Sequence, residues 1–122
     1  IRNWRSGSFH KDKFLMGWMP PHPTFFVKKE VFEKYGYYDT SFKTAADYEL
    51  LIRFLYKYEI STTYLPEVLV KMRVGGESNR NLIQRLRANK EDLLAWSKNN
   101  LKPKFYTRYL KPLSKIPQYL LK

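Results

Sequence analysis

Seven prolines limit the regular structure that this chain of 122 residues can form. Three of them fall within residues 18–23, and because proline fixes φ and lacks an N–H group, we predict a stiff, non-helical loop there. Pro66 separates two segments rich in β-branched residues. The last three divide the end of the chain into short helical pieces: Pro103, Pro112 and Pro117.

The segments between these breaks predict both strands and helices. Residues 24–27 are β-branched and aromatic, which favours a short buried strand, and a helix is predicted at 29–35, ending at Gly36. Residues 44–58 carry apolar side chains at helical spacing and predict a second helix. Two more strands are predicted at 60–65 and 68–74.

A further helix is predicted from Ser78 or Asn79 to about Asn99, where a polar residue caps the first turn. Its inner face would carry apolar residues at helical spacing: Leu82, Leu86, Leu93 and Trp96. With 43% apolar residues the chain has enough for one core, and we expect an α/β fold of short strands with flanking helices and a helical C-terminal extension. We predict that residues 1–78 form part of a folded domain and that residues 79–122 form a C-terminal helix with a basic amphipathic extension.

The net charge of +12 is unevenly distributed. Residues 93–122 contain seven basic residues and no acidic one, so this segment attracts polyanions, either nucleic-acid phosphates or anionic lipid head groups. One interpretation of 101–122 is a peripheral membrane contact; the other is a solvated basic face whose apolar side chains pack on the domain. The interleaved residues are Lys102, Lys104, Arg108, Lys111, Lys115 and Lys122 with Phe105, Tyr109, Leu113, Ile116 and Leu120.

Cysteine is absent, which excludes disulfides and thiolate metal sites and permits a reducing compartment. The longest apolar runs are interrupted by charges and are too short to span a bilayer, so no transmembrane segment is predicted. The sequence starts at Ile1 with no leader, and we expect it to be part of a longer polypeptide.

Asp47 is the candidate catalytic residue. It lies in the first turn of the helix predicted at 44–58, at the head of the inward face. One interpretation is a general base, for which a partly desolvated carboxylate is suited. The other is a capping box with Thr44, in which Asp47 accepts a hydrogen bond from the backbone at the start of the helix.

His22 is the second candidate, because the surrounding prolines would hold its imidazole in place for ligand binding; alternatively it bonds a neighbouring carbonyl. Gly75, Gly76 and Ser78 resemble an anion-binding turn, or form a simple strand-to-helix turn. Among the aromatic residues, Trp18 and Tyr38 are the candidates for contact with a sugar ring, whereas Phe26 is predicted to lie in the core.

In order, these segments resemble family 2 glycosyltransferases that build bacterial surface polysaccharides. The similarity covers roughly residues 1–80, in the acceptor-side half of such enzymes, and the helix and basic tail resemble their C-terminal extension. The matching segments are Pro21-His22-Pro23-Thr24-Phe25-Phe26-Val27-Lys28-Lys29-Glu30-Val31, Lys34-Tyr35-Gly36-Tyr37-Tyr38-Asp39-Thr40-Ser41-Phe42, Ala45-Ala46-Asp47-Tyr48-Glu49-Leu50 with Arg53, and Gly75-Gly76-Glu77-Ser78.

The resemblance implies the C-terminal portion of a GT-A fold and an inverting transfer of sugar from a nucleotide-diphosphate sugar to a glycan or lipid-linked acceptor. Asp47 would be the base, with Ala46 where the family usually has a second acid. His22 and residues 75–78 would line the site. The family's Asp-x-Asp, which binds Mg²⁺ or Mn²⁺ at the diphosphate, is absent from this sequence. We therefore expect the isolated chain to be inactive, with the metal held by a missing half.

The resemblance also implies a cytoplasmic enzyme, peripheral on the inner face of the cell membrane, and the missing half predicts self-association through exposed apolar surface. The alternative function is a basic nucleic-acid-binding or interaction module without catalysis, which the pI near 9.9 permits. No helix-turn-helix or zinc-finger spacing supports a specific nucleic-acid partner.

Overall fold

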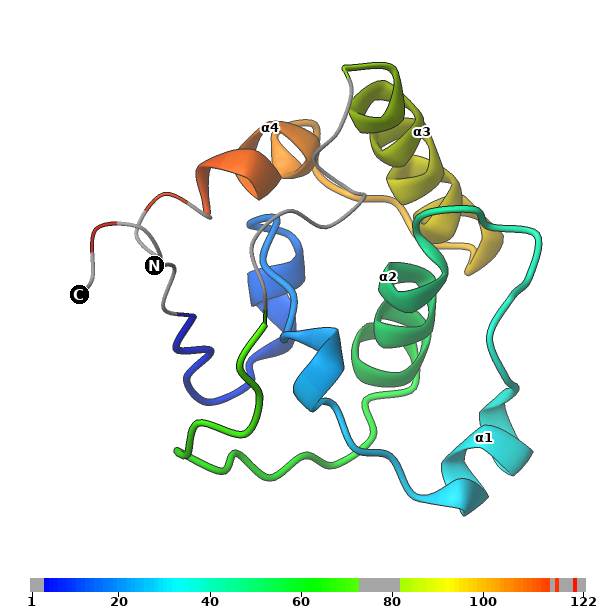
Figure 1. Cartoon of the computed structure of the whole chain (residues 1–122). Coiled ribbons are helices and arrows are strands. Elements are labelled where there is room, and N and C mark those ends of the chain that lie inside the picture. Colours follow the sequence, from blue (N-terminus) through cyan, green and yellow to red (C-terminus); the bar gives the residue numbers. More distant parts are fainter. Residues whose placement is uncertain (1–3, 73–81, 115, 117–119, 121–122) are drawn as a thin grey trace.

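The computed structural model describes residues 4–72, 82–114, 116 and 120. Every regular element within these residues is helical. Figure 1 shows α2 in the middle of the molecule, α3 and α4 above it, and α1 at the opposite end from α4. The elements in chain order are η1 (Lys11–Phe14), η2 (His22–Thr24), α1 (Lys29–Tyr35), α2 (Ala46–Leu51), η3 (Ile52–Lys57), α3 (Leu82–Lys98) and α4 (Thr107–Leu113).

The predicted α/β fold, the C-terminal portion of a GT-A fold, is wrong for this structure, because the described residues contain no strand. Residues 60–72 have no regular structure and are almost entirely exposed, and among the described residues only Ile60 in this segment makes a backbone hydrogen bond, to Phe54 at 3.1 Å. Strand preference expresses the fit of a side chain to a pleated, half-buried sheet. Without a neighbouring strand, a β-rich sequence does not form a strand.

The predicted strand at 24–27 is also absent. Thr24 ends the 3-10 turn η2, and Phe26 is 80% exposed, so its predicted core position is wrong. The loop at 18–23 was predicted to be non-helical, yet η2 begins at His22. A single 3-10 turn is compatible with proline, since proline supplies the required φ and its missing N–H is not needed in the first turn.

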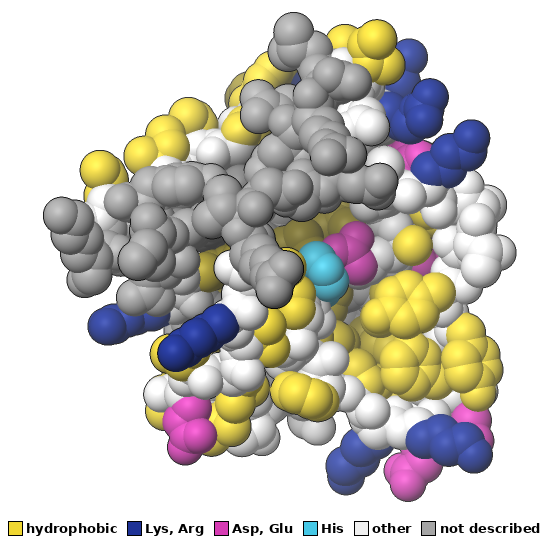
Figure 2. Space-filling view, viewed as in Figure 1, with side chains coloured by type: hydrophobic (Ala, Val, Ile, Leu, Met, Phe, Trp, Pro, Cys, Tyr) yellow, Lys and Arg dark blue, Asp and Glu magenta, His cyan; other side chains and the backbone are white. Residues whose placement is uncertain are grey.

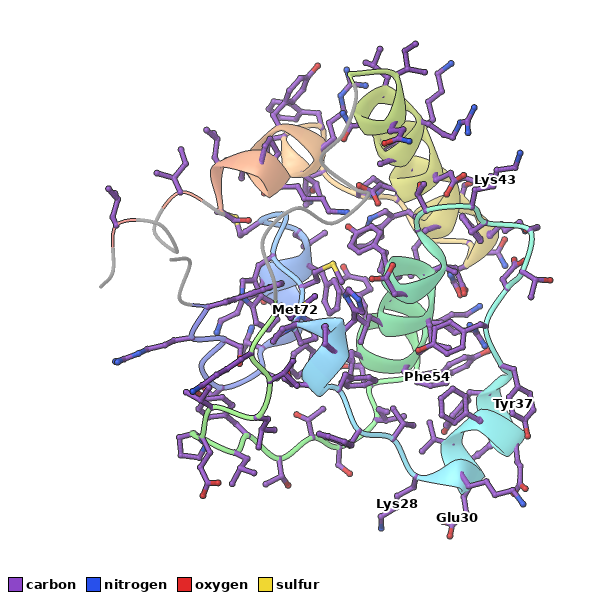
Figure 3. The ribbon with its side chains drawn as sticks, viewed as in Figure 1. Lys28, Glu30, Tyr37, Lys43, Phe54 and Met72 are labelled. Atoms are coloured by element: carbon purple, nitrogen blue, oxygen red, sulfur yellow. The ribbon has the colours of Figure 1, made fainter. Side chains whose placement is uncertain are left out.

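The two helices predicted in the first half of the chain are confirmed. Helix α1 occupies the predicted residues, and Gly36 follows it with φ +92°, a conformation that glycine adopts without strain. The helix predicted at 44–58 is formed by α2 and its direct continuation η3, a π-helical segment. The two together place the side chain of Phe54 in the interior, as Figure 3 shows.

One core joins residues from both predicted parts of the chain. Phe14 of η1 and six apolar or aromatic residues of α2 and η3 pack with Trp96 of α3. The predicted boundary between 78 and 79 lies outside the described residues. The fully or almost fully buried apolar residues are Phe14, Phe42, Ala45, Tyr48, Leu50, Leu51, Ile52, Phe54, Leu55, Ala95 and Trp96.

Helix α3 buries a different face from the one predicted. Trp96 is buried as expected, but Leu86 and Leu93 are exposed, and the side chain of Leu82 lies outside the description. The inner positions are instead occupied by Asp92, Ala95 and Asn99, and the amide of Asn99 donates a hydrogen bond to buried Glu49 at 3.0 Å. This face of α3 is buried because its polar side chains form hydrogen bonds with partners on α2 and α4. A prediction from the spacing of apolar residues does not include such polar contacts.

Helix α4 packs on the segment that follows η1. The hydroxyl of Thr107 donates a hydrogen bond of 2.6 Å to the carbonyl of Leu15. Gly17 has φ +76°, and a Cβ there would lie 2.8 Å from the carbonyl carbon of Leu110 and closer still to the backbone of Lys111. A glycine is therefore required where the two backbones meet. Across the described segments, no helix is both long and apolar enough to cross a membrane.

Candidate functional site

His22 and Asp47 lie side by side, although 25 positions separate them in the sequence. Nδ1 of His22 is 3.0 Å from Oδ2 of Asp47, and the two side chains are 54% and 29% exposed, respectively. The histidine comes from η2 and the aspartate from the first turn of α2. Two residues predicted from the sequence to belong to one site are thus brought together.

The turn that carries His22 is closed by its own hydrogen bonds. The backbone N–H and the hydroxyl of Thr24 both donate to the carbonyl of Pro21 at 3.0 Å. The N–H of Phe25 donates to the carbonyl of His22 at 3.1 Å. Since Pro21 and Pro23 also restrict the backbone, the imidazole is held beside Asp47 with little loss of conformational entropy.

The capping box predicted from Thr44 and Asp47 is not formed. The N-cap residue of α2 is Ala45, which makes no side-chain cap hydrogen bond. Glu91 of α3 instead binds the backbone that leads into α2: its carboxylate accepts hydrogen bonds from the N–H groups of Lys43 (3.2 Å), Thr44 (2.7 Å) and Ala45 (2.9 Å). Oδ1 of Asp47 accepts only the N–H of the next residue, Tyr48, at 2.9 Å, so Oδ2 faces His22.

The pKa values of the pair move in opposite directions. Burial alone would raise the pKa of Asp47, but the hydrogen bond and charge of His22, with the N–H of Tyr48, together lower it below 3.8. The hydrogen bond to Asp47 raises the pKa of His22 above 6.5, against the opposing effect of burial. Asp47 is therefore ionised at neutral pH, and at any given pH a larger fraction of His22 is protonated than of a free imidazole.

Lys111 of α4 is a neighbour of the site that the sequence pattern did not reveal. Its positive charge also contributes to the lowered pKa of Asp47. Nζ of Lys111 is 2.5 Å from Oδ2 of Asp92 and 3.7 Å from the ring centroid of Tyr48. In one of the two interpretations of 101–122, Lys111 belonged to a membrane contact, but its contacts with Asp92 and Tyr48 show that it points inward.

The other predicted site residues belong to different parts of the molecule. Tyr38 is exposed, with its ring 6.2 Å from Phe32 of α1. Trp18 packs against Phe14 at 6.3 Å between ring centroids and borders an open apolar hollow next to α4. Gly75, Gly76 and Ser78 lie outside the described residues.

The chemistry open to the pair is proton transfer and hydrogen bonding. Nδ1 of His22 is used by Asp47, which leaves Nε2 for a ligand. Within the described part of the chain, no three side chains of the His, Cys, Asp and Glu types come together to bind a metal ion. In the pair, a histidine holds a carboxylate in a fixed orientation, an arrangement that can accept a proton from a bound ligand.

Comparison with family models, with curated proteins and with solved structures finds no match for this chain.

Proposed function

We propose that this chain carries the acceptor-activating site of an inverting glycosyltransferase, as a fragment of an enzyme that moves a sugar from a nucleotide-diphosphate sugar to a glycan or lipid-linked acceptor. The observation that supports it is the ion pair of His22 and Asp47, which keeps a partly exposed carboxylate deprotonated and fixed in orientation. Asp47 is the proton acceptor and His22 the positioning residue, whose Nε2 contacts the substrate.

In the proposed step, the acceptor hydroxyl gives its proton to Asp47 while its oxygen attacks the anomeric carbon of the donor sugar. The new carbon–oxygen bond forms as the bond to the diphosphate breaks, and the nucleoside diphosphate leaves with the bonding electrons. A carboxylate of low pKa suits this role when proton transfer occurs late, after attack has made the hydroxyl acidic. Attack opposite the leaving group inverts the anomeric configuration.

Hydrophobic side chains on the same face as the pair support the proposal of a sugar ligand. Figure 2 shows a histidine beside an acidic side chain on the same face as hydrophobic side chains that lie over α1. In this region the rings of Phe32 and Tyr37 stack at 5.6 Å between centroids, and Figure 3 shows Tyr37 at the outer side of α1. Exposed aromatic faces offer an apolar surface for the C–H groups of a sugar ring.

Sugar transfer by the longer polypeptide predicted to carry this chain tests the proposal. Asp47→Asn should preserve the fold and lower kcat at least ~100-fold, because a general base contributes that much or more. His22→Ala should have a smaller effect, mainly on KM. His10 and Asp12 form an exposed His–Asp pair at 3.6 Å, so His10→Ala and Asp12→Asn are matched controls that should leave turnover unchanged. Near-normal turnover of Asp47→Asn would contradict the assignment.

The isolated chain provides a second test. Calorimetric titration with UDP-glucose and GDP-mannose, with and without Mg²⁺ or Mn²⁺, should give binding weaker than micromolar, because the diphosphate and metal ligands are expected in the missing half. Micromolar, metal-dependent binding by this chain would place the donor site here and contradict the proposal that the donor site lies in the missing half.

A further inference from the structure

Helix α4 is fixed to the rest of the molecule through one of its faces. Thr107 is hydrogen-bonded to Leu15, Lys111 is paired with Asp92, and the hydroxyl of Ser114 lies 3.5 Å from the carbonyl of Gly17. These three positions are spaced by four and three residues, so they share one side of the helix. The opposite side consequently has a defined orientation.

That opposite side is apolar and exposed. We call Phe105, Tyr109, Leu113 and Ile116 the α4 outer face; their side chains are 86%, 58%, 54% and 51% exposed. They follow one another at spacings of four, four and three residues, which aligns them along the helix and its continuation. Figure 2 shows hydrophobic side chains at the surface along the edge of the molecule that α4 forms. Contiguous apolar surface of this kind marks an interaction site.

Positive charge surrounds the α4 outer face. Lys102, Lys104 and Arg108 are exposed, and the guanidinium of Arg108 lies 4.6 Å from the ring centroid of Tyr109. No acidic residue follows Asp92 in the sequence, and Asp92 itself is buried and paired with Lys111. Lys102, Lys104 and Arg108 form no ion pair with another described residue, so these exposed cations can contact an external anion.

An apolar hollow of about 380 Å³ extends this surface toward η1. Met16, Trp18, Leu110 and Leu113 line it, and Lys13 stands at its side with Nζ 5.0 Å from the Trp18 ring. Leu113 belongs both to the hollow and to the α4 outer face. Apolar and basic groups from two distant parts of the sequence thus form one continuous surface.

We propose that the α4 outer face, with Lys102, Lys104 and Arg108, binds peripherally to the surface of an anionic lipid membrane. Aromatic and aliphatic side chains settle at the head-group boundary while basic side chains contact the lipid phosphates. Leu113 and Ile116 favour a membrane over a nucleic acid, because aliphatic side chains do not stack on bases as aromatic rings do. This inference does not depend on the proposed sugar transfer.

Co-sedimentation of the chain with large unilamellar vesicles tests this proposal, using phosphatidylcholine alone or with 30% phosphatidylglycerol. Binding is expected only to the anionic vesicles. Each basic residue near such a surface strengthens binding about fivefold, so the Lys102→Gln, Lys104→Gln, Arg108→Gln triple variant should bind about 100-fold more weakly. Binding that is equal for the two kinds of vesicle, or absent from both, would overturn the proposal.

The control triple is Lys28→Gln, Lys29→Gln and Lys34→Gln on and beside α1, since Figures 1 and 3 place this helix and Lys28 at the end of the molecule away from α4. Both triples lower the net charge from +12 to +9, so equal losses would show that only total charge matters and would reject the α4 surface. Circular dichroism of each variant verifies that its helices are retained.

A second pair of variants tests the apolar part of the surface. Phe105 and Phe26 are exposed to a similar extent, 86% and 80%, but only Phe105 belongs to the α4 outer face. Phe105→Ser should weaken vesicle binding about tenfold, as loss of a large buried apolar side chain does, whereas Phe26→Ser should not change it. Equal effects of the two variants, or tighter binding of the wild type to single-stranded DNA than to anionic vesicles, would overturn the membrane assignment.

Discussion

The carboxylate of Glu91 accepts hydrogen bonds from both the backbone N–H and the hydroxyl of Thr44, at 2.7 and 2.8 Å, although the two residues are 47 positions apart. Burial alone would raise the pKa of Glu91, but the hydrogen bonds from Thr44, Lys43 and Ala45 outweigh it and lower that pKa. A residue of α3 thereby fixes the backbone of residues 43–45 that leads into α2, while Asp47 accepts the N–H of Tyr48 and pairs with His22.

Replacement of Glu91 should show how much its hydrogen bonds to residues 43–45 stabilise the fold. We expect Glu91→Ala to lower the free energy of unfolding by about 1–2 kcal/mol, since hydrogen bonds to a charged group contribute more than neutral ones, with Glu91→Gln less damaging because an amide oxygen still accepts hydrogen bonds. Urea unfolding followed by circular dichroism measures this free energy. Lys90→Ala, an exposed neighbour on the same helix, is the control and should change stability little. Equal stability of Glu91→Ala and Lys90→Ala would show that the hydrogen bonds of Glu91 contribute nothing.

Gly17 and Gly7 provide a matched pair for the packing of α4. Both have positive φ, +76° and +68°, but a Cβ at Gly7 would find its nearest neighbour at 3.9 Å, whereas at Gly17 it would collide with the backbone of Lys111. Gly7→Ala should cost about 1 kcal/mol for the backbone conformation alone, and Gly17→Ala about 2–4 kcal/mol. Thermal unfolding compares them. If the two variants melt alike, α4 does not pack on residue 17 in solution.

The pairing of His22 with Asp47 should be visible in the titration of His22. Asp47→Asn removes the negative partner that raises the pKa of His22, so the midpoint of the His22 ring C–H shift in NMR should move to lower pH. The same measurement on Asp12→Asn controls for general charge effects and should leave His22 unchanged. An unaltered midpoint in Asp47→Asn would mean that the two side chains do not interact.

The same pair predicts how stability varies with pH. The raised pKa of His22 gives a contribution that is complete below pH 6.5 and is lost as pH rises through the folded-state value. The lowered pKa of Asp47 gives a contribution that is present above pH 3.8 and is lost as pH falls through its folded-state value. The pair should therefore stabilise most between these limits, by less than about 1 kcal/mol because both groups are partly exposed. Urea midpoints of the wild type should exceed those of His22→Gln most clearly near pH 5 and converge above pH 8.

The exposed segment 61–72 should make the chain self-associate. Several of its side chains are large and apolar, including Val68 and Val70. Exposed segments with high strand preference and unpaired backbone groups pair with copies of themselves. Light scattering at rising concentration should show dimers or larger species, and Val68→Lys with Val70→Lys should shift the population toward monomer. A concentration-independent monomer in the wild type would contradict this prediction.

Sequence patterns predicted what depends on neighbours within one helix. The apolar spacing after Asp47 and the glycine after Tyr35 were sufficient to predict α1 and the α2–η3 helix. The pattern failed where a distant partner decides the structure. Residues 60–72 have strand preference but no partner strand among the described residues, and Glu91 of α3 binds the N–H and hydroxyl of Thr44 that the predicted capping box with Asp47 required.

The same distinction between local patterns and distant partners applies to the candidate site. His22 and Asp47 were each chosen for local reasons, a rigid proline turn and a carboxylate heading a buried face, and their 3.0 Å contact agrees with both. Lys111 was missed, because nothing within its own segment distinguishes a lysine that pairs with Asp92 from the exposed Lys102 and Lys104. The packing of α4 on the rest of the molecule determines that Lys111 points inward while Lys102 and Lys104 point to solvent.

The hydrogen bond between Thr107 and Leu15 spans 92 positions of the chain, and it also determines when this protein can fold during its synthesis. A ribosome releases η1 long before it releases α4, so the backbone at Gly17 has no docking partner while most of the polypeptide is being made. Contacts of such separation slow folding, since a long loop must be closed before they form. The apolar side chains of Met16 and Trp18, which border the hollow lined by Leu110 and Leu113, therefore remain incompletely covered until translation has passed α4, and this interval is when the nascent chain most needs protection from aggregation.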